Sequence, residues 1–269
     1  MGATASQCLP EDARGRCCIQ DPEEEPKISG GPQYEGEWQG KHWHGKGKLV
    51  LPGGHSYKGE FVQSQAHGYG TLVDASGTTY EGEWRLFRKH GKGKYTHVDG
   101  TVYEGQWKED QKVGYGVETW SDGTRYEGQF SNGSKQGAGK YITPTGGSYE
   151  GEFANDVMHG FGCYTFADGR IYEGEWEGGA MSGHGRMDFP DGSSYDGFYD
   201  AGVRSGFGTL TRSDGRKYKG QWLNGVEHGK GVLVEEGGKE WRGMWRNGAF
   251  AKASRSRAKS GTPSSGSSS

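Results

Sequence analysis

The chain has 269 residues, of which 53 are glycine, 13% are aromatic and only 30% are hydrophobic. So small an aliphatic content excludes a thick globular core, because burial of apolar surface is the main driving force of folding. The net charge of −3 at pH 7 excludes a strongly basic surface of the kind that binds nucleic acid, so we expect no nucleic-acid partner.

The first eight residues, MGATASQC, fit the N-myristoylation motif M-G-x-x-x-[ST], with Gly2 at the acylated position. A single myristoyl chain gives only marginal membrane affinity, so stable attachment requires a second signal. Cys8, Cys17 and Cys18 are candidates for S-palmitoylation. The alternatives are incidental cysteines in a disordered leader, or a disulfide or metal role, although no histidine lies nearby and nothing indicates secretion.

Residues 1–33 contain twice as many acidic as basic side chains, so no basic patch supports the lipid anchor. They also lack a hydrophobic stretch long enough for a signal peptide or a membrane span. The acidic run Asp21–Pro26 indicates an extended, solvated linker. We therefore expect residues 1–33 to form a disordered, acylated leader and an acidic linker.

From Tyr34 onward an aromatic residue opens the same five-residue phrase ten times, always 23 residues apart, from YEGEW at Tyr34 to WRGMW at Trp241. A fixed period indicates stacked units that bury their apolar faces against one another. Aromatic residues two positions on either side of a glycine share one face of a strand. Two further glycines come eleven and thirteen residues after each opening aromatic, and we expect a second strand after them.

The second strand carries an apolar residue fifteen after the opening aromatic in eight of nine units, with Glu118 as the exception. A fourth regular glycine, as in the Asp99-Gly100 pair, indicates a turn with φ > 0. Each unit is thus predicted to be a β-hairpin. We predict an all-β fold, an elongated, twisted array of about ten stacked hairpins over residues 34–248, in which the tenth unit ends after its first strand, near Gly248.

The phrase YEGEW, the H-G-x-G segment His44-Gly45-Lys46-Gly47 and the later D-G pairs resemble the MORN (membrane occupation and recognition nexus) repeat. The resemblance covers about residues 34–248. It implies a role like those of other MORN arrays, which occur as scaffolds, as membrane-associated assembly factors and as accessory segments of lipid kinases and SET-domain methyltransferases. Those enzymes carry a separate catalytic domain.

No CxxC, HExxH or GxxxxGK[ST] motif occurs in the chain. The histidine of H-G-x-G occurs in five of nine units, always at the same place in the unit, which favours a structural role at the hairpin bend over catalysis or metal binding. Only 21 residues follow Gly248, too few for a catalytic domain. We therefore expect a non-enzymatic protein without a cofactor or a metal. The recurring histidines are His44, His67, His90, His159 and His228.

Positions twelve and fourteen after the opening aromatic alternate in character with a period of 46 residues. Odd units are mainly basic there, and even units are mainly aromatic or apolar. By strand parity these side chains share a face with the glutamates of the first strand. The basic set is Lys46, Lys48, Lys92, Lys94, Lys140 and Arg186, and the aromatic set is Tyr69, Tyr115, Phe161 and Phe207.

Two interpretations of the basic set remain open. The favoured one is cross-strand pairing with the glutamates of units one, three and seven, each pair worth about 0.2–1 kcal/mol. The other is contact with acidic phospholipid headgroups. We interpret the aromatic set as a row of exposed side chains that binds a partner helix or a second array, because exposed apolar patches mark interaction sites.

Residues 249–269 contain four basic side chains and no acidic one, and serine and glycine dominate the rest. This composition predicts a disordered basic tail. The tail either contacts acidic lipids, with phosphorylation of Ser260 or Thr262 cancelling the attraction, or only adds solubility.

The whole pattern indicates a non-enzymatic scaffold held by acyl chains at the cytoplasmic face of a membrane, with the plasma and flagellar membranes as candidates. Its array would bind proteins, with cytoskeletal or flagellar proteins as candidate partners. The alternative is a module that binds acidic phospholipids directly, or a regulatory partner of a lipid-signalling enzyme. An unpaired terminal strand at Trp241 would also allow a homodimer.

Overall fold

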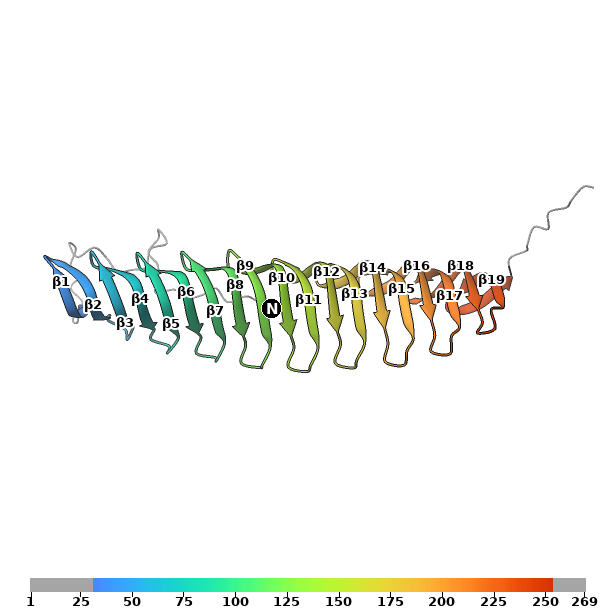
Figure 1. Cartoon of the computed structure of the whole chain (residues 1–269), viewed down its shortest axis with the longest axis horizontal. Coiled ribbons are helices and arrows are strands. Elements are labelled where there is room, and N and C mark those ends of the chain that lie inside the picture. Colours follow the sequence, from blue (N-terminus) through green and yellow to red (C-terminus); the bar gives the residue numbers. More distant parts are fainter. Residues whose placement is uncertain (1–30, 254–269) are drawn as a thin grey trace, which may run out of the picture. The chain divides into compact units, whose positions relative to one another are not determined.

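The computed structural model describes residues 31–253, and these form two units, one ending at Ala167 and one beginning at Asp168. Each unit is an array of antiparallel hairpins, in which strands consecutive in the chain lie side by side (Figure 1). The predicted all-β repeat fold is confirmed. The first unit contains β1 (Gln33–Gln39), β2 (His42–Val50), β3 (Ser56–Val62), β4 (Gln65–Val73), β5 (Thr79–Arg85), β6 (Arg88–Thr96), β7 (Val102–Lys108), β8 (Gln111–Thr119), β9 (Arg125–Ser131), β10 (Ser134–Ile142), β11 (Ser148–Ala154) and β12 (Val157–Thr165). The second contains β13 (Ile171–Glu177), β14 (Ala180–Asp188), β15 (Ser194–Asp200), β16 (Val203–Thr211), β17 (Lys217–Leu223), β18 (Val226–Val234), β19 (Glu240–Arg246) and β20 (Ala249–Ala253).

The second strand of each hairpin begins earlier than expected, because it contains the two glycines that were predicted to precede it. In the β5–β6 hairpin the turn is Leu86-Phe87, with φ of 53° and 59°. Two residues with φ > 0 match the twist of the flanking strands, as in type I′ turns. Gly91 then forms a β-bulge, with φ of 55° and a register shift on the opposite strand. In this turn bulky residues left no glycine signal, but the equivalent turns at Asn132-Gly133, Asn224-Gly225 and Asn247-Gly248 carry an Asn-Gly signal that was missed.

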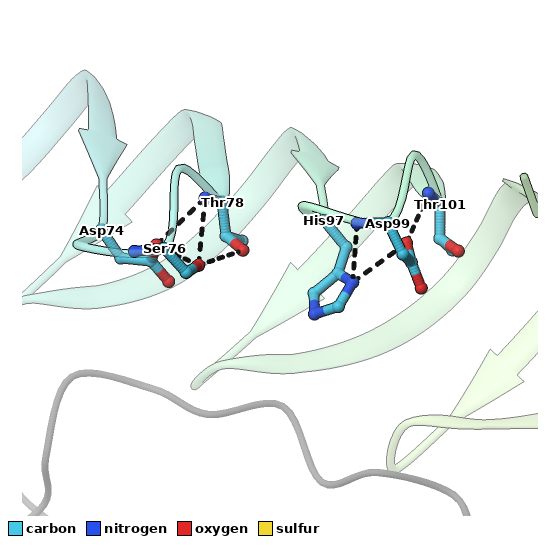
Figure 2. A network of polar contacts seen from close by, with 6 residues as sticks. All are labelled: Asp74, Ser76, Thr78, His97, Asp99 and Thr101. Atoms are coloured by element: carbon cyan, nitrogen blue, oxygen red, sulfur yellow. Dashed lines mark hydrogen bonds and ion pairs between the residues drawn. The ribbon is translucent and has the colours of Figure 1, made fainter.

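The turns between hairpins lie where the sequence places them, at the fourth regular glycine. Figure 2 shows two of them, in which an aspartate carboxylate accepts hydrogen bonds from backbone N–H groups ahead of it. Asp74 accepts from Ser76 and Thr78, at 2.8 and 3.0 Å, and Asp99 accepts from Thr101 at 2.7 Å. The bond from Thr101 is the main reason that the pKa of Asp99 is lowered to about 2.

A ladder of aromatic rings forms the core of each unit. The Tyr80 ring packs edge-on against Trp84 of its own hairpin and Trp107 of the next, with centroids 4.9 and 5.4 Å apart. In the second unit Tyr195 contacts Trp222 of the next hairpin at 5.0 Å. Such edge-to-face pairs add about 0.5–1.5 kcal/mol beyond their buried area. We call this side of the sheet the ring face, and the side that carries Glu81 and its equivalents the glutamate face.

Facing glycines make room for each tyrosine of the ladder. A Cβ on Gly82 would lie 2.5 Å from the Cα of Gly93 and 2.8 Å from the Tyr80 hydroxyl. That hydroxyl donates to the backbone carbonyl of Glu83 at 3.0 Å and lies 3.3 Å from that of His90. The ring therefore lies across its own hairpin, in space that any side chain at the glycines would fill.

The tenth repeat has a second strand, which differs from the expectation that it ends near Gly248. Residues 249–253 form β20, which pairs with β19. The Phe250 ring packs against Trp245 with centroids 5.0 Å apart, so the ladder continues into residues expected to be tail.

Replacing Gly82 by alanine should lower the free energy of unfolding by about 1–3 kcal/mol, because the added methyl group overpacks against Gly93 and Tyr80. Urea unfolding followed by tryptophan fluorescence measures this loss. Gly237→Ala is the matched control, since no heavy atom lies within 4 Å of a Cβ there. Equal losses in the two variants would contradict the packing role assigned to Gly82.

The ladder tyrosines should remain neutral at pH values where free tyrosine ionises. Burial raises the pKa of Tyr126, Tyr149 and Tyr218 to about 12. A folded-state pKa above the unfolded value of about 10 stabilises the fold fully below pH 10, and this stability is lost as the pH rises toward about 12. Phenolate absorbance should thus rise in a late phase together with loss of the β-sheet circular dichroism signal. Ionisation of these residues near pH 10 in the folded protein would contradict the assignment.

Candidate functional site

The glutamate face collects the side chains that the 46-residue period singled out. Glu81 on β5 lies opposite Lys94 on β6, and Tyr69 on β4 lies opposite Glu83 on β5. The predicted strand parity is therefore confirmed for these positions. The ring face, which holds the core, is on the other side of the sheet.

The aromatic set is exposed on this face. Tyr69, Tyr115 and Phe161 lie on β4, β8 and β12 of the first unit and are 52%, 48% and 54% exposed, and Phe207 on β16 of the second unit is 60% exposed. In the first unit successive rings are four strand spacings apart, or about 19 Å. The Tyr69 hydroxyl donates to the Glu81 carboxylate at 3.0 Å, and that of Tyr115 donates to Glu127. These bonds orient the two tyrosine rings on the surface.

The lysines of the basic set are not paired as expected. Lys46 and Lys48 on β2, and Lys92 and Lys94 on β6, form no ion pair with any residue in the segment 31–253. Lys94 faces Glu81 in the register, yet the two side chains make no salt bridge within the described chain.

The remaining two basic residues are paired, Lys140 with its cross-strand neighbour on β11 and Arg186 with a residue of its own strand. Lys140 lies 3.5 Å from Glu150 in an exposed pair, which contributes little to stability. Arg186 binds Asp188 at 2.6 Å, and this hydrogen bond is the main cause of its raised pKa.

The glutamates at the fourth position of each phrase are engaged by the backbone instead. The Glu83 carboxylate accepts the backbone N–H of Lys92 at 2.9 Å, and Glu175 does the same for His184 at 3.0 Å. The carboxylate also covers the bulge glycine, where an added Cβ would lie 2.6 Å from it at Gly183. The recurrence of glutamate or glutamine at this position was a sequence signal for this role, and it was missed.

The recurring histidines lie at the bulge, beside the same glycine, rather than at the hairpin turn. The backbone carbonyl of His90 lies 3.3 Å from the Tyr80 hydroxyl, and His159 has the same relation to Tyr149. In residues 31–253 no three His, Cys, Asp or Glu side chains come together as a metal-binding group. No helix within these residues is long and apolar enough to cross a bilayer.

A row of cations on the ring face was also missed from the sequence. Nine residues after the opening aromatic, three successive repeats carry a lysine whose ammonium group lies over ladder rings. These are Lys89, Lys112 and Lys135, and the Lys89 ammonium is 5.0 Å from the Trp107 centroid. Lys112 pairs with the exceptional Glu118 at 2.5 Å, which explains why a carboxylate is tolerated at a core position. The 23-residue spacing of the three lysines was the available signal.

Six of the predicted site residues lie outside the described residues. These are Gly2, Cys8, Cys17, Cys18, Ser260 and Thr262.

Comparison with protein families identifies the repeat. The family model described as "MORN repeat" matches nine consecutive segments, at residues 34–56, 57–79, 80–102, 103–125, 126–148, 149–169, 172–194, 195–215 and 218–234. No curated protein matches the chain significantly.

Similar solved structures include the TCP10 domain of CPAP from Danio rerio, with 11% identity and a TM-score of 0.42 over 78% of this chain and 99% of that one. The SAS-4 (dCPAP) TCP domain of Drosophila melanogaster, in complex with a proline-rich motif of Ana2, has 10% identity and a TM-score of 0.30 over 83% and 98%. Virginiamycin B lyase from Staphylococcus aureus has 12% identity and a TM-score of 0.15 over 80% and 74%. TM-scores this low support no conclusion about fold or function.

Proposed function

Because the chain belongs to the MORN repeat family, whose repeats serve as scaffold and binding modules, we propose that it is a membrane-anchored scaffold whose array binds protein partners at the cytoplasmic face of a membrane. The exposed row Tyr69, Tyr115 and Phe161 on the glutamate face carries this proposal. The core ladder lies on the opposite face, so packing does not account for these rings. Exposed aromatic residues in a regular row are typical of interaction surfaces.

The geometry of the row limits the shape of the partner. Tyr69 and Phe161 are eight strand spacings apart, a distance of about 38 Å at the usual spacing. A helix that contacts all three rings would need about 25 residues at 1.5 Å per residue. The proposed partner is therefore a protein with a long helical or extended segment, and cytoskeletal and flagellar proteins are candidates.

The membrane anchor of this proposal depends on the sequence motif. Gly2 would carry a myristoyl group, and Cys8, Cys17 and Cys18 would carry palmitoyl groups, which together give stable attachment. The acidic linker between residues 21 and 26 would then separate the array from an anionic leaflet.

The double variant Tyr115→Ser/Phe161→Ser should lose most of the proteins that crosslink to the wild type in cells, as measured by quantitative mass spectrometry. As the central anchors of the interface, the two rings should each contribute more than about 1 kcal/mol, which is at least about a thirtyfold loss for the pair. The melting temperature should not fall, because both rings lie outside the core.

The matched control is Val98→Ser/Val157→Ser, which removes two exposed apolar side chains of the same unit outside the row. Unchanged crosslinking by the aromatic variant, or equal losses in both variants, would contradict the proposed surface. A lower melting temperature would assign the rings to the core.

Direct binding to acidic phospholipids is the second candidate function, with regulation of a lipid-signalling enzyme as a related possibility. It is favoured by Lys46, Lys48, Lys92 and Lys94, which share one face and form no ion pair with residues 31–253. Each lysine near an anionic leaflet would contribute about 1 kcal/mol.

Vesicle flotation should separate the two functions. Protein that has been myristoylated at Gly2 should float with vesicles in lipid excess, whereas the unlipidated protein and Gly2→Ala should not. Flotation of unlipidated protein only with phosphatidylserine vesicles, and its loss in Lys46→Glu/Lys48→Glu/Lys92→Glu/Lys94→Glu, would instead support the second function. Equal flotation of the acylated protein and of Gly2→Ala would overturn the anchor.

A further inference from the structure

The second unit contains a hollow of about 240 Å³ on its ring face. Met181, Met187 and Phe189 supply apolar walls, and the lining also includes Tyr199, Arg204 and Gly225. Small-molecule sites usually enclose about 300–1,000 Å³, so this hollow suits a single side chain rather than a whole ligand. It lies on the face of this unit opposite to Phe207 and is independent of the function proposed above.

Tyr199 brings an unsatisfied hydroxyl to the hollow. The other nine repeats have phenylalanine or tryptophan at this position, and the Tyr199 ring fills the same place in the ladder, 5.2 Å from Tyr172 and 5.3 Å from Tyr195. The residue is 6% exposed. Burial raises its pKa to about 12, so the hydroxyl remains a donor at neutral pH.

The Arg204 guanidinium lies beside the Tyr199 hydroxyl, and its charge and N–H groups partly offset this rise in pKa. A guanidinium can only donate, so the hydroxyl proton itself has no acceptor among residues 31–253. A buried hydroxyl without a partner is destabilising, and an acceptor from outside would remove that cost.

Arg204 lacks the carboxylate that two equivalent cations have. Its guanidinium lies over ladder rings, 4.9 Å from the Tyr195 centroid and 5.4 Å from that of Trp222, and it forms no ion pair with any described residue. The equivalent Lys112 pairs with Glu118, and Lys135 pairs with Asp156 at 3.6 Å.

Around Arg204, the two positions that hold these carboxylates in other repeats are occupied by residues without a charge. Leu210 stands at the position of Glu118, and Gly225 stands at the position of Asp156. Because Gly225 lines the hollow, the space beside Arg204 adjoins the position that in the fifth and sixth repeats holds Asp156, the carboxylate paired with Lys135.

We propose that this hollow binds an acidic side chain of a partner peptide, whose carboxylate accepts hydrogen bonds from the Arg204 guanidinium and the Tyr199 hydroxyl. Apolar atoms beside that carboxylate pack against Met181 and Phe189. A guanidinium and a hydroxyl together match the acceptor geometry of a carboxylate. A phosphate group suits the hollow less well than a carboxylate, because it carries nearly two negative charges. The other arginine of the lining, Arg170, is already paired with Asp168 at 2.8 Å.

Methionine methyl NMR tests the proposal directly, because the chain has five methionines and two of them line the hollow. The probes are an acetylated, amidated Gly-Ser-Leu-Glu-Leu-Ser-Gly peptide and its Glu→Gln counterpart. The Glu peptide should shift the Met181 and Met187 methyl signals saturably and bind at least about tenfold more tightly than the Gln peptide, with Met244 as the internal reference. Equal affinities, or no shift at millimolar peptide, would overturn the proposal.

Three variants test the assigned contacts. Arg204→Gln should weaken the Glu peptide at least about tenfold, and Tyr199→Phe about threefold or more. Gly225→Asp should abolish binding by giving Arg204 a carboxylate within the chain. Aspartate fits there, because φ is 80° at Gly225 and 70° at the equivalent Asp156, and an added Cβ would lie 3.5 Å from Val203.

Arg216→Gln is the matched control, since Arg216 pairs with Asp214 away from the hollow lining. It should bind the Glu peptide as the wild type does. The Met244 signal and the circular dichroism spectrum report whether each variant is folded. Wild-type affinity in folded Gly225→Asp or Arg204→Gln would show that the carboxylate binds elsewhere.

Discussion

Across each of the first nine hairpins a tyrosine ring lies over two facing glycines, as Tyr80 does over Gly82 and Gly93, and its hydroxyl donates to a backbone carbonyl. The ring fills the space that two side chains would otherwise occupy. It then contacts an aromatic residue of the next hairpin, so each repeat buries the apolar surface of its neighbour. A chain with few aliphatic residues can thus build a core from a single sheet.

Concentrating the core on one face leaves the other face free to vary. On the glutamate face only the fourth-position acid or amide is tied to the backbone, where it caps the bulge, as Glu83 does for Lys92. The side chains twelve and fourteen residues after the opening aromatic do not cap the bulge. The 46-residue alternation of lysines with Tyr69, Tyr115 and Phe161 occurs at these unconstrained positions, which is where a binding surface can diverge without loss of folding.

The ring face also varies, but under a charge constraint. A cation over the ladder is stabilised by the rings, and in two repeats by a carboxylate of the chain, as in Lys112 with Glu118. Arg204 keeps the rings but has no such carboxylate, and Tyr199 adds a buried donor beside it. These two departures from the repeat meet in the lining of one hollow.

The sequence by itself determined the hairpin repeat, the 23-residue period and the face on which each side chain lies, because period and parity are local properties of a strand. The positions of the Leu86-Phe87 turn and of β20 were decided by the tertiary structure, since strand twist selected φ > 0 at bulky residues and packing of Phe250 on Trp245 extended the array. Side-chain partners were also decided there. Glu83 bonds the backbone rather than a lysine because the bulge presents an N–H group to its carboxylate, and a contact of this kind depends on three-dimensional geometry that spacing does not encode.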